Sequence, residues 1–255
     1  MAEETKIGGR SDKFPATRWS AILAARSTDS RERARAWESI AAAYWKPIYK
    51  YLRIRWNKSN EDAKDLTQEF FSRLIAKDYL DDFDPAKARL RTFLRVCADR
   101  FVANQAKAAG RLKRGGNAQH VPLDFAGADA EIERARASLP ENAPAETAED
   151  FLEKEFIRSL FGLAVGDLRR LCDTRGKQLH FRLFERYDLD GGGPGRAGYA
   201  ELACEFGIPV TDVTNYLAFA RREFRRLALE RLREMTATEE EFRREARALL
   251  GVRHE

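Results

Sequence analysis

The pattern of hydrophobic and polar positions predicts helices along most of this chain. Apolar residues recur at intervals of three and four, the spacing that places side chains on one face of an α-helix. We therefore expect an all-α protein with two small helical domains joined by a flexible linker. The expected divisions are a disordered N-terminus at 1–16, a first helical domain at 17–114, a linker at 115–148, a second helical domain at 149–235 and a C-terminal helical extension at 236–255.

Two helices are predicted at the start of the first domain. A short helix that Thr17 can cap carries Trp19, Ile22 and Leu23. A longer helix begins near Ser30, and its apolar face holds Trp37, Ile40, Ala41, Tyr44 and Ile48, which we assign to the core. Pro47 lies inside this helix, so we expect a kink or a break near Trp45, because proline cannot donate the helical hydrogen bond.

The stretch 61–74 is the most informative part of the first domain. At helical spacing, one face carries Leu66, Phe70 and Leu74. Another face carries Asp62, Asp65 and Glu69. We expect the apolar face to be buried and the other to offer carboxylates to a partner.

A basic, aromatic helix is predicted at 90–107, with its charge continuing to residue 114. The stretch 89–114 holds eight Lys or Arg residues against one Asp, which is typical of a phosphate-binding surface. Phe93 and Phe101 either stack on unpaired bases or belong to the core. We assign Phe101 to the core, because it shares a helical face with Leu94.

The stretch 115–148 lacks lasting periodicity and is predicted to be a linker. It holds Pro122, Pro140 and Pro144, paired glycines and scattered Ala, Glu and Asp. A short helix is expected within it, at about 129–137.

The second domain begins with two predicted helices, one from Glu149 and one at 177–187. The loop 188–195 begins Asp-Leu-Asp-Gly, like a calcium-binding loop, but Tyr199 occupies the twelfth position, where a bidentate Glu is required. We therefore reject calcium binding. We expect no cofactor at all, because the glycines also lack the Lys-Ser or Lys-Thr of a phosphate-binding loop.

The stretch 199–217 is typical of a helix-turn-helix, with a short helix, a turn at Gly207 and a second helix opened by Pro209. The small core between the helices is expected to hold Leu202, Ala203, Ile208, Val213 and Leu217. The residues expected to point elsewhere are Asp212, Thr214, Asn215 and Ala218. In DNA-binding versions, exposed early residues of the second helix enter the major groove. The alternative is an ordinary helical hairpin with a solvated charged face.

The second helix of this hairpin continues into an arginine-rich segment. Six arginines stand against two glutamates in 221–233, and we expect them to bind phosphates. A final amphipathic helix is predicted to begin with a cap at Thr238 to Glu241 and to end near Leu250. It is either a tail that packs on the second domain or an interaction element.

Composition adds three expectations. The 34% of charged residues and the net charge of +5 favour a soluble, nucleic-acid-tolerant protein. Cys97, Cys172 and Cys204 are odd in number and far apart, so we expect reduced, buried thiols and neither disulfides nor a zinc site. No stretch approaches the roughly 20 apolar residues of a membrane span, so we expect no membrane insertion and a cytoplasmic location.

We do not expect an enzyme. The sequence shows no nucleophile elbow and no metal-ligand cluster. The three histidines, His120, His180 and His254, are isolated in the linker, a helix and the tail. No catalytic residue and no metal ligand is therefore assigned.

Two motifs resemble those of bacterial RNA polymerase sigma factors of the extracytoplasmic-function (ECF) subfamily. Asp62-Ala-Lys-Asp-Leu-Thr-Gln-Glu-Phe-Phe71 is similar to the family's core-binding helix, Asp-Ala-Glu-Asp-Leu-x-Gln-Glu-x-Phe. Tyr199-Ala-Glu-Leu-Ala through Gly207-Ile-Pro-Val210 is similar to its second-domain hairpin. The resemblance covers about 19–114, like sigma region 2, and about 151–233, like sigma region 4.

The resemblance implies a transcription initiation factor that binds core RNA polymerase, directs it to specific promoters and assists promoter melting. It implies contacts with the coiled coil of the largest polymerase subunit from Asp62, Asp65, Gln68 and Glu69, and a further contact with the polymerase flap. It implies promoter DNA contacts in the first domain from Arg95, Arg100, Asn104, Lys107, Arg111, Lys113 and Arg114. In the second domain it implies DNA contacts from Thr211, Thr214, Asn215, Arg221 and Arg222. An anti-sigma factor is a further partner typical of the family.

The chain departs from the family pattern in both motifs. Lys64 replaces an acidic residue of the core-binding motif and weakens its negative field. In the hairpin's second helix, positions that are usually more basic hold Thr211, Asp212, Thr214, Asn215, Tyr216 and Phe219. We expect altered specificity in preference to loss of binding, because Asn215 can pair with an adenine edge.

Thr67 motivates a regulatory hypothesis. It lies beside the acidic face, and phosphorylation by a Ser/Thr kinase would add up to about two negative charges there. The alternative is an inert threonine in a partly buried helix.

The residues leave two other functions open. One is a stand-alone helix-turn-helix transcriptional regulator that binds duplex DNA alone and uses the acidic helix as a dimer face. The other is a sigma-like interaction protein that no longer reads the distal promoter element.

Overall fold

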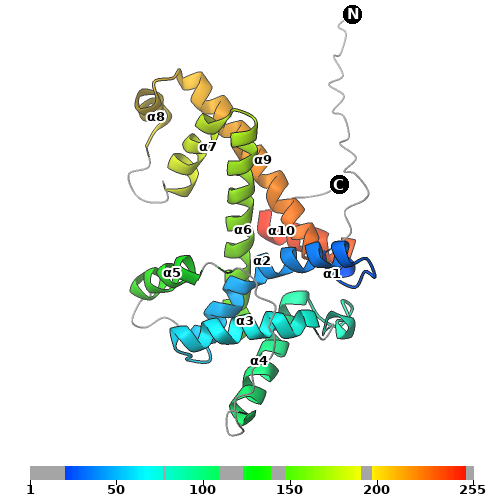
Figure 1. Cartoon of the computed structure of the whole chain (residues 1–255). Helices are drawn as coiled ribbons and strands as arrows, with labels where there is room; N and C mark the ends of the chain where they lie inside the picture. Colours follow the sequence, from blue (N-terminus) through cyan, green and yellow to red (C-terminus); the bar gives the residue numbers. More distant parts are fainter. Residues whose placement is uncertain are drawn as a thin grey trace, which may run out of the picture.

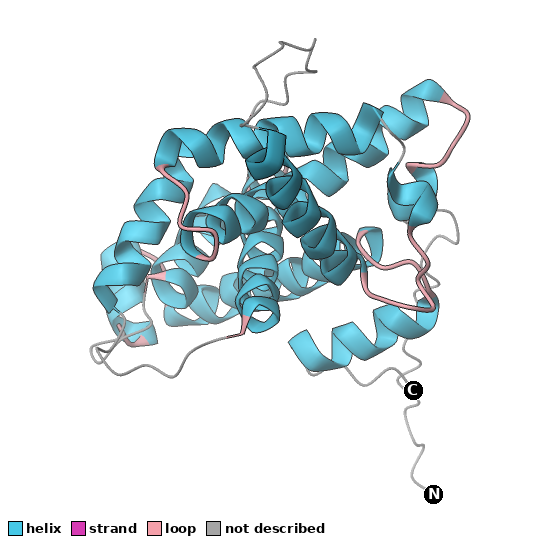
Figure 2. Ribbon diagram, turned by 90° about the horizontal axis from the view of Figure 1, so that it is seen from below, coloured by secondary structure: helices cyan, strands magenta, loops and turns pink. Residues whose placement is uncertain are grey.

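The computed structural model describes residues 21–76, 79–108, 123, 125–138, 147–190 and 197–250. All regular structure in these ranges is helical, as Figure 2 shows, so the expected all-α class is confirmed for them. The α-helices are α1 (Ala21–Ala24), α2 (Ser30–Ile54), α3 (Asn60–Ala76), α4 (Leu90–Ala108), α5 (Phe125–Ser138), α6 (Ala148–Thr174), α7 (Gln178–Phe184), α8 (Tyr199–Phe206), α9 (Val210–Glu234) and α10 (Glu239–Leu250). A 3-10 turn, η1 (Tyr79–Asp82), precedes α4, and a π-helical turn, η2 (Glu185–Leu189), follows α7. The expectations for 1–16, Thr17 and Trp19 lie outside the described residues.

The larger hydrophobic core, here called the first core, is built around α2. It combines α1 to α5 with the first part of α6, the last part of α9 and all of α10. The rings of Tyr44 and Phe156 stack with centroids 5.0 Å apart and join α2 to α6. The apolar face predicted for α2 is buried, and so are Phe70 and Leu74 of α3, whereas Leu66 is half-buried.

Helix α2 runs through Pro47 without ending, so a break near Trp45 is wrong, while a kink there stays a prediction. A proline inside a helix costs about 3 kcal/mol. Tyr44, Ile48 and Tyr49 on either side are almost wholly buried, and burying a large apolar side chain contributes about 1.5–3 kcal/mol. Packing of the aromatic face thus outweighs the local cost of the proline.

A smaller hydrophobic core, here called the second core, lies at the other end of α6. Its buried residues are Leu168, Cys172, Phe181, Leu183, Phe184, Leu202, Ala203, Val213, Leu217 and Ala220. Helices α6 and α9 pack on one another and supply residues to both cores (Figure 1). The cores therefore meet within α6, between Ala164 and Leu168, and not at residue 149, where the predicted domain boundary lies. The two-domain division stays a prediction.

The helices with the two motifs singled out in the sequence, α3 and the pair α8 and α9, lie toward opposite ends of α6. Figure 1 shows α3 and α4 near one end of α6, and α7 and α8 near the other. Helix α5 is the helix expected inside the linker, and it begins earlier than predicted, at Phe125. It packs on α2 with Ala128 and Ile132 buried.

Candidate protein and nucleic-acid interfaces

The first half of α3 presents two exposed carboxylates. Asp62 and Asp65 are both exposed, while Phe70 and Phe71 of the same helix are buried in the first core. Asp62 also has a local role, because its carboxylate accepts a hydrogen bond from the Ser59 hydroxyl at 2.8 Å at the start of the helix. Neither aspartate forms an ion pair with another described residue. Both are therefore available to a cationic partner.

The other two predicted polymerase contacts, Gln68 and Glu69, are less accessible to a partner. Glu69 pairs with Arg73 at 2.5 Å, and its other oxygen accepts a hydrogen bond from Gln105 of α4. Gln68 is only partly exposed. The four predicted contact residues thus divide into an exposed pair, Asp62 and Asp65, and a partly buried pair.

The structure does not support Thr67 as a kinase site. Its side chain is fully buried, and its hydroxyl donates a hydrogen bond to the carbonyl of Ala63 at 2.7 Å. A kinase must reach the hydroxyl, and a phosphate there would bury about two charges. The prediction of phosphorylation at Thr67 is wrong for this folded state. Thr67 is close to the acidic residues in sequence, but its side chain is on the buried side of α3.

Helix α5 contributes a carboxylate that the motif analysis missed. Asp129 lies 3.9 Å from Lys64 and accepts a hydrogen bond from the side-chain amide of Asn60. It also accepts the hydroxyl proton of Tyr49, and burial together with this bond raises the pKa of that tyrosine. Asp129 partly offsets the charge of Lys64, the motif's basic departure. No local signal could reveal this, because Asp129 lies in the predicted linker.

Much of the charge of α4 is neutralised by carboxylates from other helices. Arg91 is 6% exposed and forms ion pairs with Glu153 of α6 and Glu245 of α10, the latter at 2.9 Å. Arg89 pairs with the same two glutamates. The expectation of a strongly basic surface is therefore wrong for the start of α4, because the compensating residues lie far along the chain.

The predicted DNA contacts of α4 differ in their availability. Arg95 pairs with Asp99 at 3.1 Å, and Asp99 also accepts hydrogen bonds from Tyr51 and Trp56. Arg100 and Asn104 are exposed. The side chain of Lys107 and the whole of Arg111, Lys113 and Arg114 lie outside the described residues. Among the described DNA contacts predicted for α4, Arg100 and Asn104 are thus the exposed ones, and Arg95 is partly buried.

The two phenylalanines of α4 do not form an open stacking platform. Phe101 is 8% exposed, which confirms its assignment to the core. Phe93 is half-buried and packs against Phe83 with ring centroids 5.3 Å apart.

Helices α8 and α9 are joined by a turn at Gly207, as predicted. Gly207 has φ of +64°, in the left-handed region that favours glycine. Pro209 occupies the N-cap position directly before α9 and makes no side-chain capping bond. The expected core residues Leu202, Ala203, Val213 and Leu217 are buried, while Ile208 is partly exposed. The predicted contact residues Thr211, Thr214 and Asn215 are exposed along one face of α9.

The arginines of α9 are mostly bonded within the protein. Arg221 donates two hydrogen bonds of 2.9 Å to Asp188, and these bonds raise its pKa. The others engaged in this way are Arg225 with the carbonyl of Leu250, Arg226 with Glu223 and Glu230, Arg231 with Asp167, and Arg233 with Glu239. Arg222 has a 69% exposed side chain, a loose 3.6 Å contact with Glu223 and a guanidinium 5.5 Å from the ring centre of Phe219. Arg222 is thus the α9 arginine with the loosest ion pair, and phosphate binding by these arginines stays a prediction.

An aromatic cluster flanks the exposed face of α9. The rings of His180 and Tyr216 stack with centroids 4.0 Å apart, and Lys177 Nζ lies 3.8 Å from the ring centre of Phe219. Burial, and then the charge of Lys177, lowers the pKa of His180. Lys177 thus places a cation beside the hairpin, and its distance in sequence from the motif explains why it was not predicted.

The cysteines follow the expectation only in part. Cys172 is buried, Cys97 is half-buried, and burial raises the pKa of the Cys97 thiol to about 11. Cys204 is exposed on α8, so its predicted burial is wrong. The neighbouring residues Leu202 and Ala203 face the second core in its place.

Within the described ranges, no group of three or more His, Cys, Asp or Glu residues could hold a metal ion. Among the same residues, no helix is long and apolar enough to cross a lipid bilayer. No protein-family model, no curated protein and no solved structure matches the chain.

Proposed function

We propose that this chain is a transcription initiation factor of the sigma type that binds core RNA polymerase and directs it to promoters. The observation that carries the proposal is the exposure of Asp62 and Asp65 on α3, the helix with the core-binding motif. Carboxylates that form no ion pair with the residues the structure describes can steer and orient a basic coiled coil of the polymerase. This function requires no covalent chemistry by the chain itself.

We propose that promoter DNA is contacted at two separate places. One is the exposed part of α4, with Arg100 and Asn104. The other is the exposed face of α9 at Thr211, Thr214 and Asn215, with α8 and α9 acting as a helix-turn-helix. Because these places lie toward opposite ends of α6, one chain can touch two promoter elements at once.

A second candidate is a sigma-like interaction protein that does not read the distal promoter element. The pairing of Arg221 with Asp188 favours this candidate, since it removes a phosphate contact next to the hairpin. Both candidates predict binding to core polymerase. They differ in whether the exposed face of α9 changes promoter choice.

Run-off transcription with reconstituted bacterial polymerase on a library of promoters tests the proposal. We expect promoter-specific transcripts only when the protein is added. Asn104→Ala and Asn215→Ala make the same chemical change on the two expected DNA surfaces, so each controls for the other. Asn104→Ala should change which sequences are transcribed at the promoter element that is melted. Asn215→Ala should change which bases are preferred at the distal promoter element, because an Asn–adenine pair is worth about 1–3 kcal/mol of discrimination.

The outcomes separate the candidates. Transcription that Asn215→Ala leaves unchanged on every promoter identifies the interaction protein. Duplex DNA binding without any association with polymerase identifies a stand-alone regulator and contradicts the proposal.

A further inference from the structure

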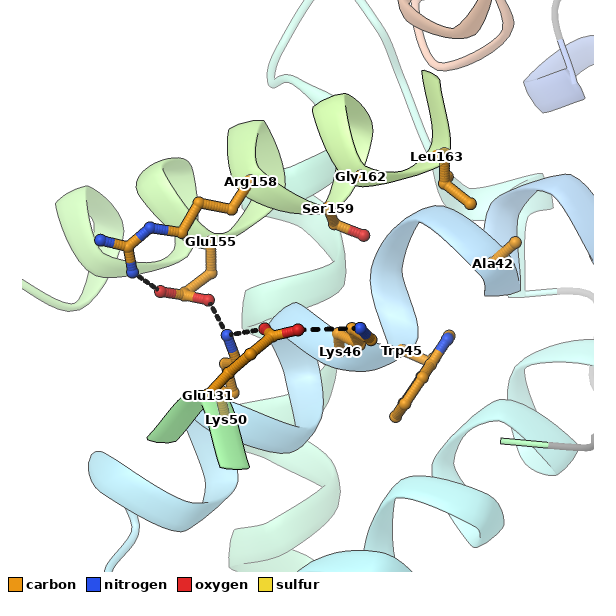
Figure 3. A pocket seen from close by; sticks show the side chains of 10 residues that line it. All are labelled: Ala42, Trp45, Lys46, Lys50, Glu131, Glu155, Arg158, Ser159, Gly162 and Leu163. Carbon is orange, nitrogen blue, oxygen red and sulfur yellow. Dashed lines mark hydrogen bonds and ion pairs between the residues drawn. The ribbon is translucent and has the colours of Figure 1, made fainter. Parts of the chain in front are cut away.

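A cavity of about 240 Å³ lies between α2, α5 and α6 (Figure 3). A water molecule occupies about 30 Å³ of liquid, so the cavity has room for a small organic molecule. Its charged lining consists of Lys46, Lys50, Glu131, Glu155 and Arg158. Three cations against two carboxylates leave one positive charge without a counterpart in the wall.

The charges are held in a connected network. Lys50 is 5% exposed, and its ammonium lies 2.6 Å from Glu155 and 2.7 Å from Glu131. The second oxygen of Glu131 lies 3.0 Å from Lys46, so this carboxylate bridges the two lysines (Figure 3). Arg158 bonds to the other oxygen of Glu155. The buried pair of Lys50 and Glu155 fixes the floor of the cavity, because neither charge can be left alone there.

Glu131 differs from the other charged groups in its origin. It comes from α5, whereas the other four come from α2 and α6, and its side chain is 36% exposed against 5% for Glu155. Burial alone would raise the pKa of Glu131, but hydrogen bonds from Lys50 and Lys46 lower it. The two lysines thus form an anion site that an intramolecular carboxylate fills from the solvent side.

The rest of the wall is mostly apolar, with Ser159 as its one uncharged polar side chain. The ring of Trp45 lies beside Lys46, with its centre 5.8 Å from the ammonium, and Leu163 borders the cavity away from the lysines (Figure 3). Gly162, which also lines the cavity, is exposed, and a Cβ built on it meets no atom within 4 Å, so the cavity is open at this side. An aromatic or aliphatic group can therefore lie beside the cationic end.

We propose that this cavity binds a small organic anion whose carboxylate or phosphate replaces Glu131 between Lys46 and Lys50 and whose apolar body lies against Trp45 and Leu163. The proposal is independent of the function proposed above. It requires the lysine pair, the open volume beside Gly162 and a displaceable Glu131.

Titration of the full chain with benzoate, phenyl phosphate and uncharged benzyl alcohol tests the proposal. The readout is the indole N–H signal of Trp45 in a two-dimensional NMR spectrum, assigned with Trp45→Phe. We expect saturable shifts at millimolar concentrations of one or both anions and none with benzyl alcohol. Benzoate and phenyl phosphate distinguish a carboxylate ligand from a phosphate ligand.

Variants decide whether the site is the one described. Glu131→Gln should tighten anion binding severalfold, because it removes the competing carboxylate. Lys46→Met should weaken binding, and Gly162→Leu should abolish it by filling the cavity. Glu38→Gln, an exposed change on the same helix as Lys46, is the matched control and should change nothing.

The proposal is overturned by any of three results. These are no saturable shift with either anion, equal binding of benzyl alcohol, or unchanged binding in Glu131→Gln and Gly162→Leu. Loss of fold cannot imitate the expected pattern, because Glu131→Gln must strengthen binding while Gly162→Leu removes it.

Discussion

Helices α3 and α9 are both highly charged, but they use their charges in opposite ways. On α3, Asp62 and Asp65 are exposed and form no ion pair within the described residues. On α9, Arg221 and Arg231 reach Asp188 and Asp167 on neighbouring elements. An aspartate is short and stays near its own helix, whereas a long guanidinium with five donors can reach a distant carboxylate. Counting charged residues in a stretch of sequence therefore overestimates how many charges are left without an intramolecular partner. The error is larger for arginine-rich α9 than for α3.

The largest expected effect comes from breaking the buried pairing of α4. Arg91→Ala removes the nearest cation of Glu245, which is 2% exposed, and leaves this carboxylate with the half-exposed Arg89 at 3.2 Å. Removing one member of a buried ion pair costs about 3–5 kcal/mol, so urea unfolding should show a loss of this size. Arg100→Ala, an exposed change on the same helix, should stay within about 0.5 kcal/mol. Equal losses in the two variants would contradict the division of α4 into paired and available arginines.

An intermediate effect should separate two adjacent arginines of α9. Arg221→Ala removes two hydrogen bonds to Asp188 at a partly exposed site and should lower the free energy of unfolding by about 1 kcal/mol. Arg222→Ala should leave stability unchanged. It should weaken binding to promoter DNA and reduce the slope of log affinity against log salt by about 1, as expected for one lost phosphate contact. The comparison is contradicted if Arg222→Ala lowers the free energy of unfolding while Arg221→Ala leaves it unchanged.

The smallest effect concerns a paired carboxylate, Glu131, in contrast to the unpaired ones of α3. Its pKa is depressed in the folded state by bonds from Lys50 and Lys46. The pairing therefore stabilises the fold above the ordinary pKa near 4.5, and this contribution is lost as the pH falls through the lower, folded value. The difference in unfolding free energy between the native chain and Glu131→Gln should shrink over that acidic window.

Lys46→Met provides the control for this pH effect. It removes one of the two donors that lower the pKa of Glu131. The acid-dependent difference caused by Glu131→Gln should be smaller in this background. A difference that is constant with pH, or unaffected by Lys46→Met, would show that the pairing does not act as described.

The sequence predicted features that depend on neighbours along a helix. The buried faces of α2 and α3, the turn at Gly207 and the exposure of Thr211, Thr214 and Asn215 follow from periodicity and turn chemistry. Thr238 also caps α10 as expected, since its hydroxyl accepts a hydrogen bond from the backbone of Glu241. These features required no knowledge of the rest of the chain.

Features that depend on distant residues were not predictable. The partners of Arg91 come from α6 and α10, and the burial of Thr67 depends on which side of α3 meets the first core. The continuity of α2 through Pro47 likewise depends on packing against other helices. Tertiary packing overrides local preference in each case.

The most direct test of the central claim is the affinity for purified bacterial core RNA polymerase of Asp65→Lys and Glu38→Lys. Both substitutions reverse an exposed carboxylate on a helix of the first core, and Asp65 lacks the capping role of Asp62. We predict that Asp65→Lys weakens binding about tenfold or more, equivalent to about 1.4 kcal/mol, whereas Glu38→Lys leaves it unchanged. Equal affinity of the two variants, or no binding by the native chain, would contradict the claim that the exposed acidic end of α3 docks the polymerase.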